Sequence, residues 1–229
     1  MAALLAEEIA SQGWGECEPI TRHQLFVHPD VPYTSHNSAM CFAVDTKPEY
    51  LEDIIRYGGE FLRRERAAGS DPGLCVAVPE QLTNPGWLIA YGFSAKQQVL
   101  NKEYAYSVAA ELGVHLSEHG GTGDGVVGAL AGAGLRLSGN DGRFRGKLTI
   151  AMPGQAVTVA DICAQTYITK VRSKADGRFL TPNELVELGE AVKAVLIDRE
   201  AVLLVAPLPT PGARGAVWRT CSKEELKAY

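Results

Sequence analysis

The sequence predicts an α/β (α+β) protein in which a mixed sheet with packed helices is followed by a smaller, mainly β module. Two observations carry this prediction. Over residues 1–137, segments with apolar residues at helical spacing alternate with short apolar runs that are typical of strands. After Leu137, short β-branched runs separated by turn residues predominate. We therefore expect two domains, formed by residues 1–140 and 141–229.

The composition is that of an ordinary globular protein and restricts the classes of partner. The 229 residues are 46% hydrophobic and 21% charged, and the net charge is −5. Nucleic-acid binding through bulk positive charge is therefore not expected, although the sequence leaves room for a local basic patch. No run approaches the roughly 18 apolar residues of a membrane span, and the N-terminus lacks the basic flank of a signal peptide. Five scattered cysteines without a CxxC pair predict a reducing, cytoplasmic location.

The first predicted domain begins with a helix over residues 2–12. Leu4, Leu5 and Ile9 share one face of this helix, and Gly13 is a stop signal. An α/β domain that begins directly on a helix leaves the apolar face of that helix partly uncovered. Self-association into a homodimer through an exposed sheet edge is therefore an open alternative.

Two strands and a long helix are expected next. The strands lie near residues 25–27 and 40–44, and the second is a near-continuous apolar run of the kind buried on both faces of a sheet. Thr46 and Glu49 have the spacing of a capping box, which predicts that a helix begins there and continues until Gly69.

Arg63, Arg64 and Arg66 lie in the last turns of this predicted helix. Positive charges complement the helix dipole at that end, so a solvated helix terminus is the expected role. An RNA- or phosphate-binding patch is the alternative.

Shorter elements complete the first domain before its glycine-rich stretch. Residues 74–78 are expected to form a strand, and an apolar segment at 87–91 follows an Asn-Pro-Gly turn. Ser94 and Asn101 are each suited to cap a short helix, and the second of these helices is expected to end at Gly113.

The second predicted domain consists mainly of strands. Residues 140–143, Asn-Asp-Gly-Arg, are typical of a hairpin turn, and residues 198–200 are expected to form a turn between two hydrophobic strands. One helix is predicted to begin at Thr181, where Glu184 completes a capping-box pattern. The expected strands are residues 147–151, 156–159, 166–171, 192–197, 201–205 and 217–220.

The most informative stretch is residues 116–134, LSEHGGTGDGVVGALAGAG. A cluster of four glycines between positions 120 and 125 leads into a helix of small residues, which another backbone can approach closely. A glycine-rich loop at a helix N-terminus presents free backbone N–H groups to an anion such as phosphate. The stretch has no Walker pattern, so a turn before a tightly packed core helix is the equal alternative.

Three motifs of the first domain resemble those of the tRNA 2-agmatinylcytidine synthetases. Residues 32–40, Pro-Tyr-Thr-Ser-His-Asn-Ser-Ala-Met, are similar to the family segment Pro-Tyr-Lys-Thr-Arg-Gly-Asn-Gly-Ala-Val. Residues 70–73, Ser-Asp-Pro-Gly, are similar to its Thr-Asn-Pro-Gly turn. Residues 123–134 match its Gly-Arg-Gly-Leu-Ile-Gly-Ala-Leu-Ala-Ala-Val-Gly motif. The resemblance covers roughly residues 1–137, and the three motifs occur in the family's order.

The resemblance implies a nucleotide-binding domain that uses ATP and Mg²⁺, with phosphoryl- or adenylyl-transfer ancestry and with a nucleotide or RNA as partner. By this resemblance, one loop provides His36, Asn37 and Ser38, and the other provides Gly121, Thr122, Gly123 and Gly125 for cofactor binding. Asp124 is the candidate to bind metal or orient a nucleophile, and His119 is a candidate acid/base catalyst. A solvated loop histidine is the alternative for His119, and a turn residue is the alternative for Asn37.

The chain also departs from the family pattern. The family begins with a strand ending in Gly-Ile-Asp-Asp-Thr-Asp, whose aspartates are natural magnesium ligands, whereas this sequence starts inside the following helix. Either the acidic motif is encoded upstream, or the protein is a degenerate relative. Asp124 replaces the arginine of the third motif, and the cysteines do not form the family's zinc ribbon. The alternative function is therefore a non-catalytic binding module for RNA or a small anion.

Overall fold

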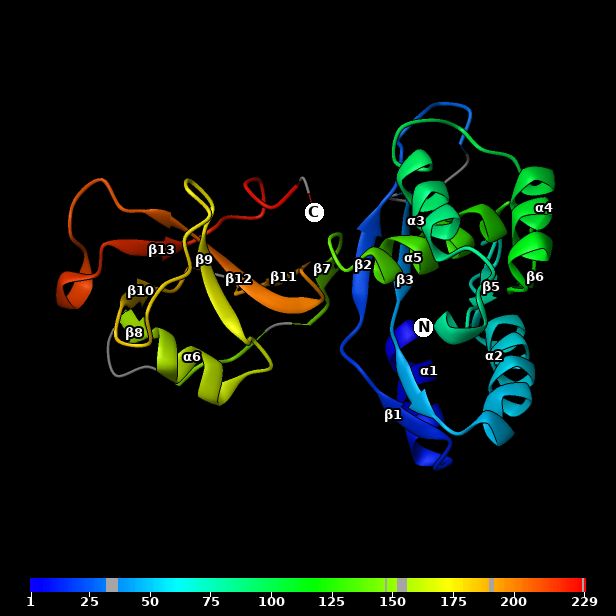
Figure 1. Cartoon of the computed structure of the whole chain (residues 1–229), viewed down its shortest axis with the longest axis horizontal. Helices are drawn as coiled ribbons and strands as arrows, with labels where there is room; N and C mark the ends of the chain where they lie inside the picture. Colours follow the sequence, from blue (N-terminus) through cyan, green and yellow to red (C-terminus); the bar gives the residue numbers. More distant parts are fainter. Residues whose placement is uncertain (32–36, 147, 152–155, 190–191, 228) are drawn as a thin grey trace. The chain divides into compact units, whose positions relative to one another are not determined.

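The computed structural model describes residues 1–31, 37–146, 148–151, 156–189, 192–227 and 229. Contacts within the chain divide it into two compact units, residues 1–138 and 139–229. The first unit combines helices with short strand pairs, and strands predominate in the second (Figure 1). The α/β (α+β) class predicted from the sequence is therefore confirmed. The assignment of the first domain to nucleotide binding stays a prediction.

The strands of the first unit form antiparallel pairs. They are β1 (Gly15–Cys17) with β4 (Val44–Thr46), β2 (Thr21–Gln24) with β3 (Ser38–Cys41), and β5 (Gly73–Val76) with β6 (His115–Glu118). The predicted strand at 40–44, buried on both faces, is wrong. The chain changes partners between Cys41 and Val44, from β2 to β1, and the Met40 side chain is 36% exposed.

Helices cover these strand pairs in the first unit. They are α1 (Ala2–Ser11), α2 (Leu51–Glu65), α3 (Pro85–Ser94), α4 (Lys102–Leu112) and α5 (Gly125–Ser138), with short 3₁₀ turns η1 (Pro48–Tyr50) and η2 (Pro79–Gln81). The helix predicted at 2–12 is confirmed as α1. Leu5 and Ile9 are buried against α2, whereas Leu4 is half exposed. Among the described residues, no helix is both long and apolar enough to cross a membrane. The cytoplasmic location and the homodimer stay predictions.

The predicted capping box at Thr46 is wrong. Thr46 is the last residue of β4, and its hydroxyl donates to the carbonyl oxygen of Trp14 instead of accepting from helix amides. The helix α2 begins only at Leu51, after the turn η1, and its N-terminal residue Tyr50 makes no side-chain cap. Because Thr46 belongs to strand β4, its hydroxyl is not available to cap the helix as the local sequence pattern predicted.

The N-termini of α3 and α4 show which of the predicted helix caps in this region form. The Asn84-Pro85-Gly86 sequence begins α3 itself, because the Asn84 side chain accepts a hydrogen bond from Trp87 N at 3.2 Å and proline fits the first helical position. Ser94 ends this helix, so its predicted cap is wrong. The cap at Asn101 is confirmed, since its Oδ1 accepts from Tyr104 N at 2.8 Å.

The core of the first unit is centred on the contact between α3 and α5. Leu88, Leu130 and Leu135 are fully buried there. A Cβ at Gly134 would overlap the carbonyl oxygen of Leu88, and one at Gly92 would lie 2.9 Å from the carbonyl oxygen of Ala131. The expectation that a second backbone approaches the small-residue helix is therefore confirmed, and the approaching backbone is α3.

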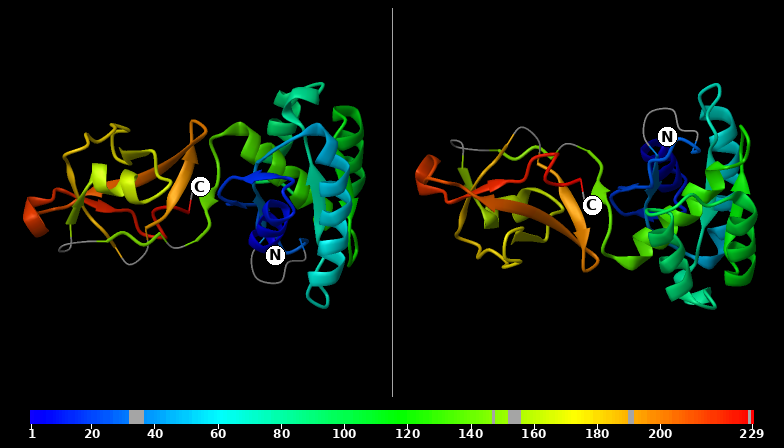
Figure 2. Two further views of the ribbon diagram at one scale, coloured as in Figure 1. Left: turned by 90° about the horizontal axis from the view of Figure 1, so that it is seen from below. Right: turned by 90° about the horizontal axis from the view of Figure 1, so that it is seen from above.

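The second unit is built on strand β12. The strand order is β7 (Arg143–Phe144), β11 (Ala194–Ile197), β12 (Glu200–Pro207), β13 (Trp218–Thr220), β10 (Leu185–Glu187) and β8 (Ala156–Thr158). β9 (Lys170–Ser173) pairs in parallel with β12. Figure 2 shows these strands from two further directions. The predicted turn between the two hydrophobic strands is confirmed, because Asp198 and Arg199 have φ values of 51° and 65° and connect β11 to β12.

The predicted helix after Thr181 is wrong. Thr181 N does donate to the Glu184 carboxylate at 2.7 Å, but β10 begins at Leu185 and pairs with β8 and β13. The helix of this unit is α6 (Val159–Gln165), which Thr158 and Asp161 begin with a true capping box, and a 3₁₀ turn η3 (Ala213–Gly215) precedes β13. Both segments have a threonine followed three residues later by an acidic residue. Only the first begins a helix, because strand β10 forms directly after the second.

Candidate functional site: the glycine loop before α5

The register of the β5–β6 pair brings the turn at Asp71 to the glycine loop. Gly73 lies opposite Glu118, and the backbone N–H of His119 donates to the carbonyl oxygen of Pro72 at 2.9 Å. Continuing this antiparallel register by one residue places Asp71 beside Gly120, where the loop begins. Two segments about 50 residues apart in sequence therefore form one site.

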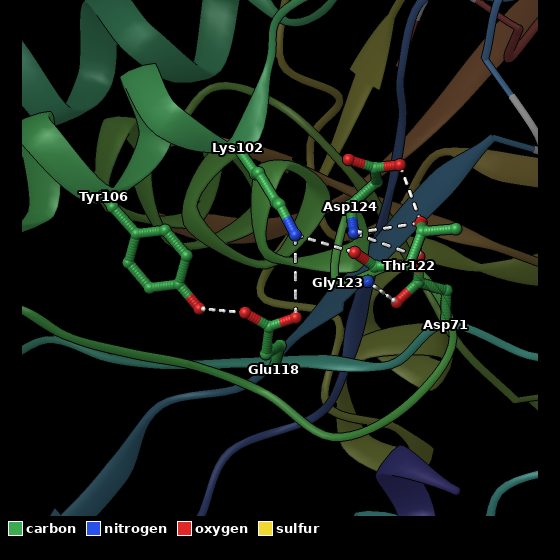
Figure 3. Close-up of polar contacts among 7 residues, drawn as sticks. All are labelled: Asp71, Lys102, Tyr106, Glu118, Thr122, Gly123 and Asp124. Atoms are coloured by element: carbon green, nitrogen blue, oxygen red, sulfur yellow. Dashed lines mark hydrogen bonds and ion pairs between the residues drawn. The ribbon is translucent and has the colours of Figure 1, made fainter.

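The Asp71 carboxylate binds the loop where it enters α5 (Figure 3). Its Oδ1 accepts from Gly123 N at 3.1 Å, and its Oδ2 accepts from Asp124 N at 3.0 Å and from the Thr122 hydroxyl at 2.6 Å. These N–H groups lie at a helix N-terminus, where the dipole also favours a negative charge. The loop thus has the donor geometry of an anion site, and a carboxylate of the protein itself uses two of its amides.

Other donors of the loop remain available. Among the described residues, no protein acceptor bonds the backbone N–H groups of Gly121, Thr122 or Gly125. Gly121 and Thr122 are exposed, and Gly121 has a positive φ of 65°, a conformation that turns successive N–H groups towards a common side. The predicted cofactor-binding residues of this loop therefore lie together.

Asp124 lies at the same place as Asp71. Its exposed carboxylate is 2.7 Å from the Thr122 hydroxyl oxygen, which is also 2.6 Å from Asp71. A hydroxyl has one proton and donates to only one of two carboxylates, so the other contact brings oxygen lone pairs together. A cation between the carboxylates would relieve this repulsion. Two carboxylates and a hydroxyl are suitable oxygen ligands for Mg²⁺, which usually keeps waters and takes further ligands from phosphate.

The protein provides few side-chain ligands for a metal at this loop. In the described part of the chain, no group of three or more His, Cys, Asp or Glu side chains could hold a metal ion. Asp71 and Asp124 alone would make a site whose remaining ligands come from solvent or from a bound phosphate.

Lys102, the first residue of α4, holds the loop from its other side. Its ammonium donates to the carbonyl oxygen of Thr122 at 2.8 Å and lies 3.8 Å from the Glu118 carboxylate. Glu118 also accepts from the Tyr106 hydroxyl at 3.2 Å. Burial, and then the Glu118 charge, raise the pKa of Tyr106, so this hydroxyl keeps its proton and stays a donor. The loop is thereby held between the Lys102 ammonium and the Asp71 carboxylate, as Figure 3 shows.

Gly123 is required by the loop itself. Its φ of +87° is a conformation that L-residues rarely adopt, and a Cβ there would overlap the Glu118 carboxylate. A Gly123→Val substitution would therefore disturb the loop before any ligand binds. Loss of ligand binding in that variant would not distinguish a phosphate loop from a structural turn.

The arginines at the end of α2 have different surroundings. Arg66 lies against the start of the glycine loop, because a Cβ at Gly120 would be 2.9 Å from its guanidinium carbon. Arg63 contacts His119, whereas the Arg64 side chain is 55% exposed and pairs with Glu65 at 2.8 Å. The expected solvated helix end therefore describes Arg64, and Arg66 adds a second cation beside the loop.

His119 faces α2. It continues the alternation of β6, so its ring shares a face with His115 and Ser117. Arg63 donates to its Nδ1 at 3.2 Å, which leaves the proton on Nε2, and the Ser117 hydroxyl at 2.8 Å from that Nε2 continues to His115 at 2.9 Å. Burial and the Arg63 charge lower the pKa of His119, so the neutral ring predominates. Both ring nitrogens are engaged away from the loop, and the role of His119 as acid/base catalyst stays a prediction.

The other predicted loop is only partly described. His36 lies outside the described residues. Asn37 Nδ2 donates to the carbonyl oxygen of Phe26 at 2.6 Å, and the Ser38 hydroxyl accepts from Arg22 at 3.1 Å. These bonds belong to the β2–β3 hairpin, and the Asn37 side chain bonds the backbone of Phe26 and not its own backbone. Cofactor binding by Asn37 and Ser38 stays a prediction.

The sequence patterns did not single out Asp71 as a site residue, and they gave no sign of Lys102 or Glu118. Asp71 stands in the Ser-Asp-Pro-Gly turn, and only its position in the motif resemblance signalled more than a turn. Lys102 directly follows a helix cap and resembles an ordinary surface lysine. Their contact with the loop depends on strand register and helix placement, which local patterns do not contain.

Comparison with known proteins finds similarity only to solved structures, and only over part of the chain. No protein-family model matches the chain, and no curated protein matches it. Similar solved structures are a tRNA fluorescent labeling enzyme (22% identity), apo TiaS, a tRNA agmatidine synthetase (20%), and a complex of TiaS with tRNA and ATP (21%), each with a TM-score of 0.48. Each match covers 58% of this chain but only 31%, 30% and 31% of those chains, respectively. The matched part of this chain therefore spans about a third of the length of each solved structure.

Proposed function

We propose that the first unit binds a nucleotide through its phosphates at the glycine loop, with ATP as the first candidate ligand. The observation that supports this most is that the amides of Gly123 and Asp124 already hold an anion, the Asp71 carboxylate, at 3.1 and 3.0 Å. The same loop has unbonded amides, and Lys102 and Arg66 flank it with positive charge. Oriented amides and nearby cations are the two features of a phosphate site.

Mg²⁺ would reconcile the phosphate with the two carboxylates. Asp71 and Asp124 would hold the ion, and the amides of Gly121, Thr122 and Gly125 would bind phosphate oxygens. When bound, the metal would neutralise phosphate charge and orient the group for transfer. Lys102 positions the loop through its bond to the carbonyl oxygen of Thr122.

The reaction class follows only from the motif resemblance, which points to an ATP-dependent ligase or transferase acting on RNA. The second candidate is a non-catalytic module that binds an anion without turnover. The engaged ring of His119 favours this second candidate, since both of its nitrogens are bonded to Arg63 and Ser117 and are not directed to the loop. Release of phosphate or AMP from labelled ATP would distinguish the two.

Calorimetric titration of ATP into the chain, with and without Mg²⁺, tests the proposal. We expect binding that requires Mg²⁺, and we expect Asp71→Asn and Asp124→Asn each to weaken it at least about tenfold, because each removes a metal ligand. Asp53→Asn is the matched control, since Asp53 is a half-exposed carboxylate on α2 that pairs with Arg56.

Two results would contradict the proposal. If ATP does not bind, or binds equally well to both loop variants, the glycine loop is a structural turn. If Asp71→Asn instead strengthens ATP binding in the absence of Mg²⁺, Asp71 competes with the phosphate and the metal role assigned to it is wrong.

A further inference from the structure

The second unit differs from the first in charge. Residues 139–229 contain thirteen Lys and Arg against ten Asp and Glu, a net charge of +3, whereas residues 1–138 contain nine against seventeen, a net charge of −8. The overall charge of −5 therefore conceals a basic unit. Such asymmetry between the parts of a chain suggests that the basic part contacts a large anionic partner.

Strand β9 arranges part of this charge in a row. Val171 and Ser173 are buried, so the alternation of the strand directs Lys170 and Arg172 to the other face. The pairing continues beyond the strand, since Lys174 N donates to the carbonyl oxygen of Val205 at 2.9 Å, and Lys174 therefore follows Lys170 and Arg172 at the same two-residue interval. Three cations thus follow one another along one face of β9 and the residue after it.

An exposed aromatic ring lies on this row. Phe179 is 45% exposed and its backbone bridges to Arg172. The Lys170 ammonium and the Arg172 guanidinium carbon lie 5.4 and 5.6 Å from the centre of its ring. The neighbouring Leu180 is buried and provides the packing for this segment. Phe179 is therefore an apolar ring held at the surface among cations.

The charges of this row are only partly compensated. Lys170 pairs with Glu200 at 2.9 Å, but Arg172 donates to the carbonyl oxygen of Gly177 and Lys174 to that of Glu225. A carbonyl oxygen accepts a hydrogen bond without removing the charge. Arg172 beside the ring, and Lys174 two residues further along, therefore keep their positive charge.

We infer that the surface formed by Lys170, Arg172, Lys174 and Phe179 binds a single-stranded nucleic-acid segment. A base would stack on the Phe179 ring while backbone phosphates contact Arg172 and Lys174. Proteins that bind single strands combine these two features, because every base has a π-face and every linkage carries a negative charge. An acidic peptide would satisfy the cations but would leave the ring without a partner. This surface lies in the second unit and does not depend on the glycine loop.

Fluorescence anisotropy with the full chain and a labelled oligouridylate of about twelve nucleotides tests the inference, since such proteins occupy about 4–16 nucleotides. We expect Phe179→Leu to weaken binding about tenfold and Phe179→Trp to retain it, because stacking on an aromatic ring contributes about 1–3 kcal/mol per base. Phe93→Leu is the matched control, since Phe93 is 37% exposed and lies in the first unit.

The salt dependence tests the cations separately. Arg172→Gln should reduce the slope of log Kd against log salt by about 0.7, as expected for one lost phosphate contact to a single strand. Lys227→Gln, at an exposed lysine paired with Glu224, should leave the slope unchanged. An oligodeoxythymidylate of the same length should bind similarly, because stacking and phosphate contacts are common to both nucleic acids.

Three results would overturn the inference. The first is an absence of oligonucleotide binding at low salt. The second is binding that changes less than about twofold in Phe179→Leu, well short of the loss expected from a stacked base, while thermal denaturation shows that the variant is folded. The third is binding of polyglutamate as tight as that of the oligonucleotide, which would show that charge alone is recognised.

Discussion

Replacing Asp71 with asparagine should destabilise the first unit, because the carboxylate connects the β5 turn to the glycine loop. Its two oxygens accept three hydrogen bonds, from Gly123 N, Asp124 N and the Thr122 hydroxyl. Asparagine offers one oxygen, which retains at most the two bonds at Oδ2, while its amide group would face the N–H of Gly123. One charge-assisted bond is lost and two become neutral, a loss of about 2–3 kcal/mol.

An opposing effect reduces this loss. The Asp71 and Asp124 carboxylates contact the same hydroxyl, and their repulsion in water-like surroundings amounts to about 1 kcal/mol. Removing one charge recovers that energy. The net destabilisation is therefore about 1–2 kcal/mol, which corresponds to a fall in Tm of about 3–8 °C for a unit of this size.

Thermal and urea denaturation of the Asp71→Asn variant measure this effect, with Asp53→Asn as control. The control should change the free energy of unfolding by less than about 0.5 kcal/mol, because Asp53 forms only an exposed ion pair on α2. If Asp71→Asn unfolds at the wild-type temperature with an unchanged m-value, the Asp71 carboxylate does not hold the loop, and the assignment of an anion site loses its main support.

Three further predictions test the fold and the hydrogen-bonded chain of His115, Ser117 and His119. Gly134→Ala should destabilise the first unit by about 1–3 kcal/mol, because its Cβ would overlap the α3 backbone, whereas Gly128→Ala meets only an ordinary contact with the Leu25 side chain and should be neutral or stabilising in urea denaturation. Burial lowers the pKa of both His115 and His119 from 6.5, so the folded state favours the neutral rings; stability should fall as the pH drops from about 6.5 through the lowered pKa values, and His119→Gln should flatten that dependence between about pH 8 and 5. Asn101→Ala should cost about 1 kcal/mol through loss of the α4 cap, and an unchanged Tm would contradict the capping geometry.

The sequence alone determined those features that depend on neighbouring residues. The α/β class, the packed small-residue helix α5, the cap at Asn101 and the turn at 198–200 all follow from periodicity or from the conformational preference of one or two residues. The glycine-rich loop belongs to this group, because the chain order alone puts a flexible, Cβ-free segment before a helix N-terminus.

The tertiary structure decided the conformation wherever the same residue could either cap a helix or join a strand. Thr46 and Thr181 both have the local pattern of a helix cap, but Thr46 lies in strand β4 and strand β10 follows Thr181 instead of a helix. The anion of the glycine loop is Asp71, a residue about 50 positions away that the β5–β6 register brings to the loop amides. Long-range pairing buries more surface and satisfies more backbone groups than one local hydrogen bond, so it prevails, and a window of neighbouring residues does not contain it.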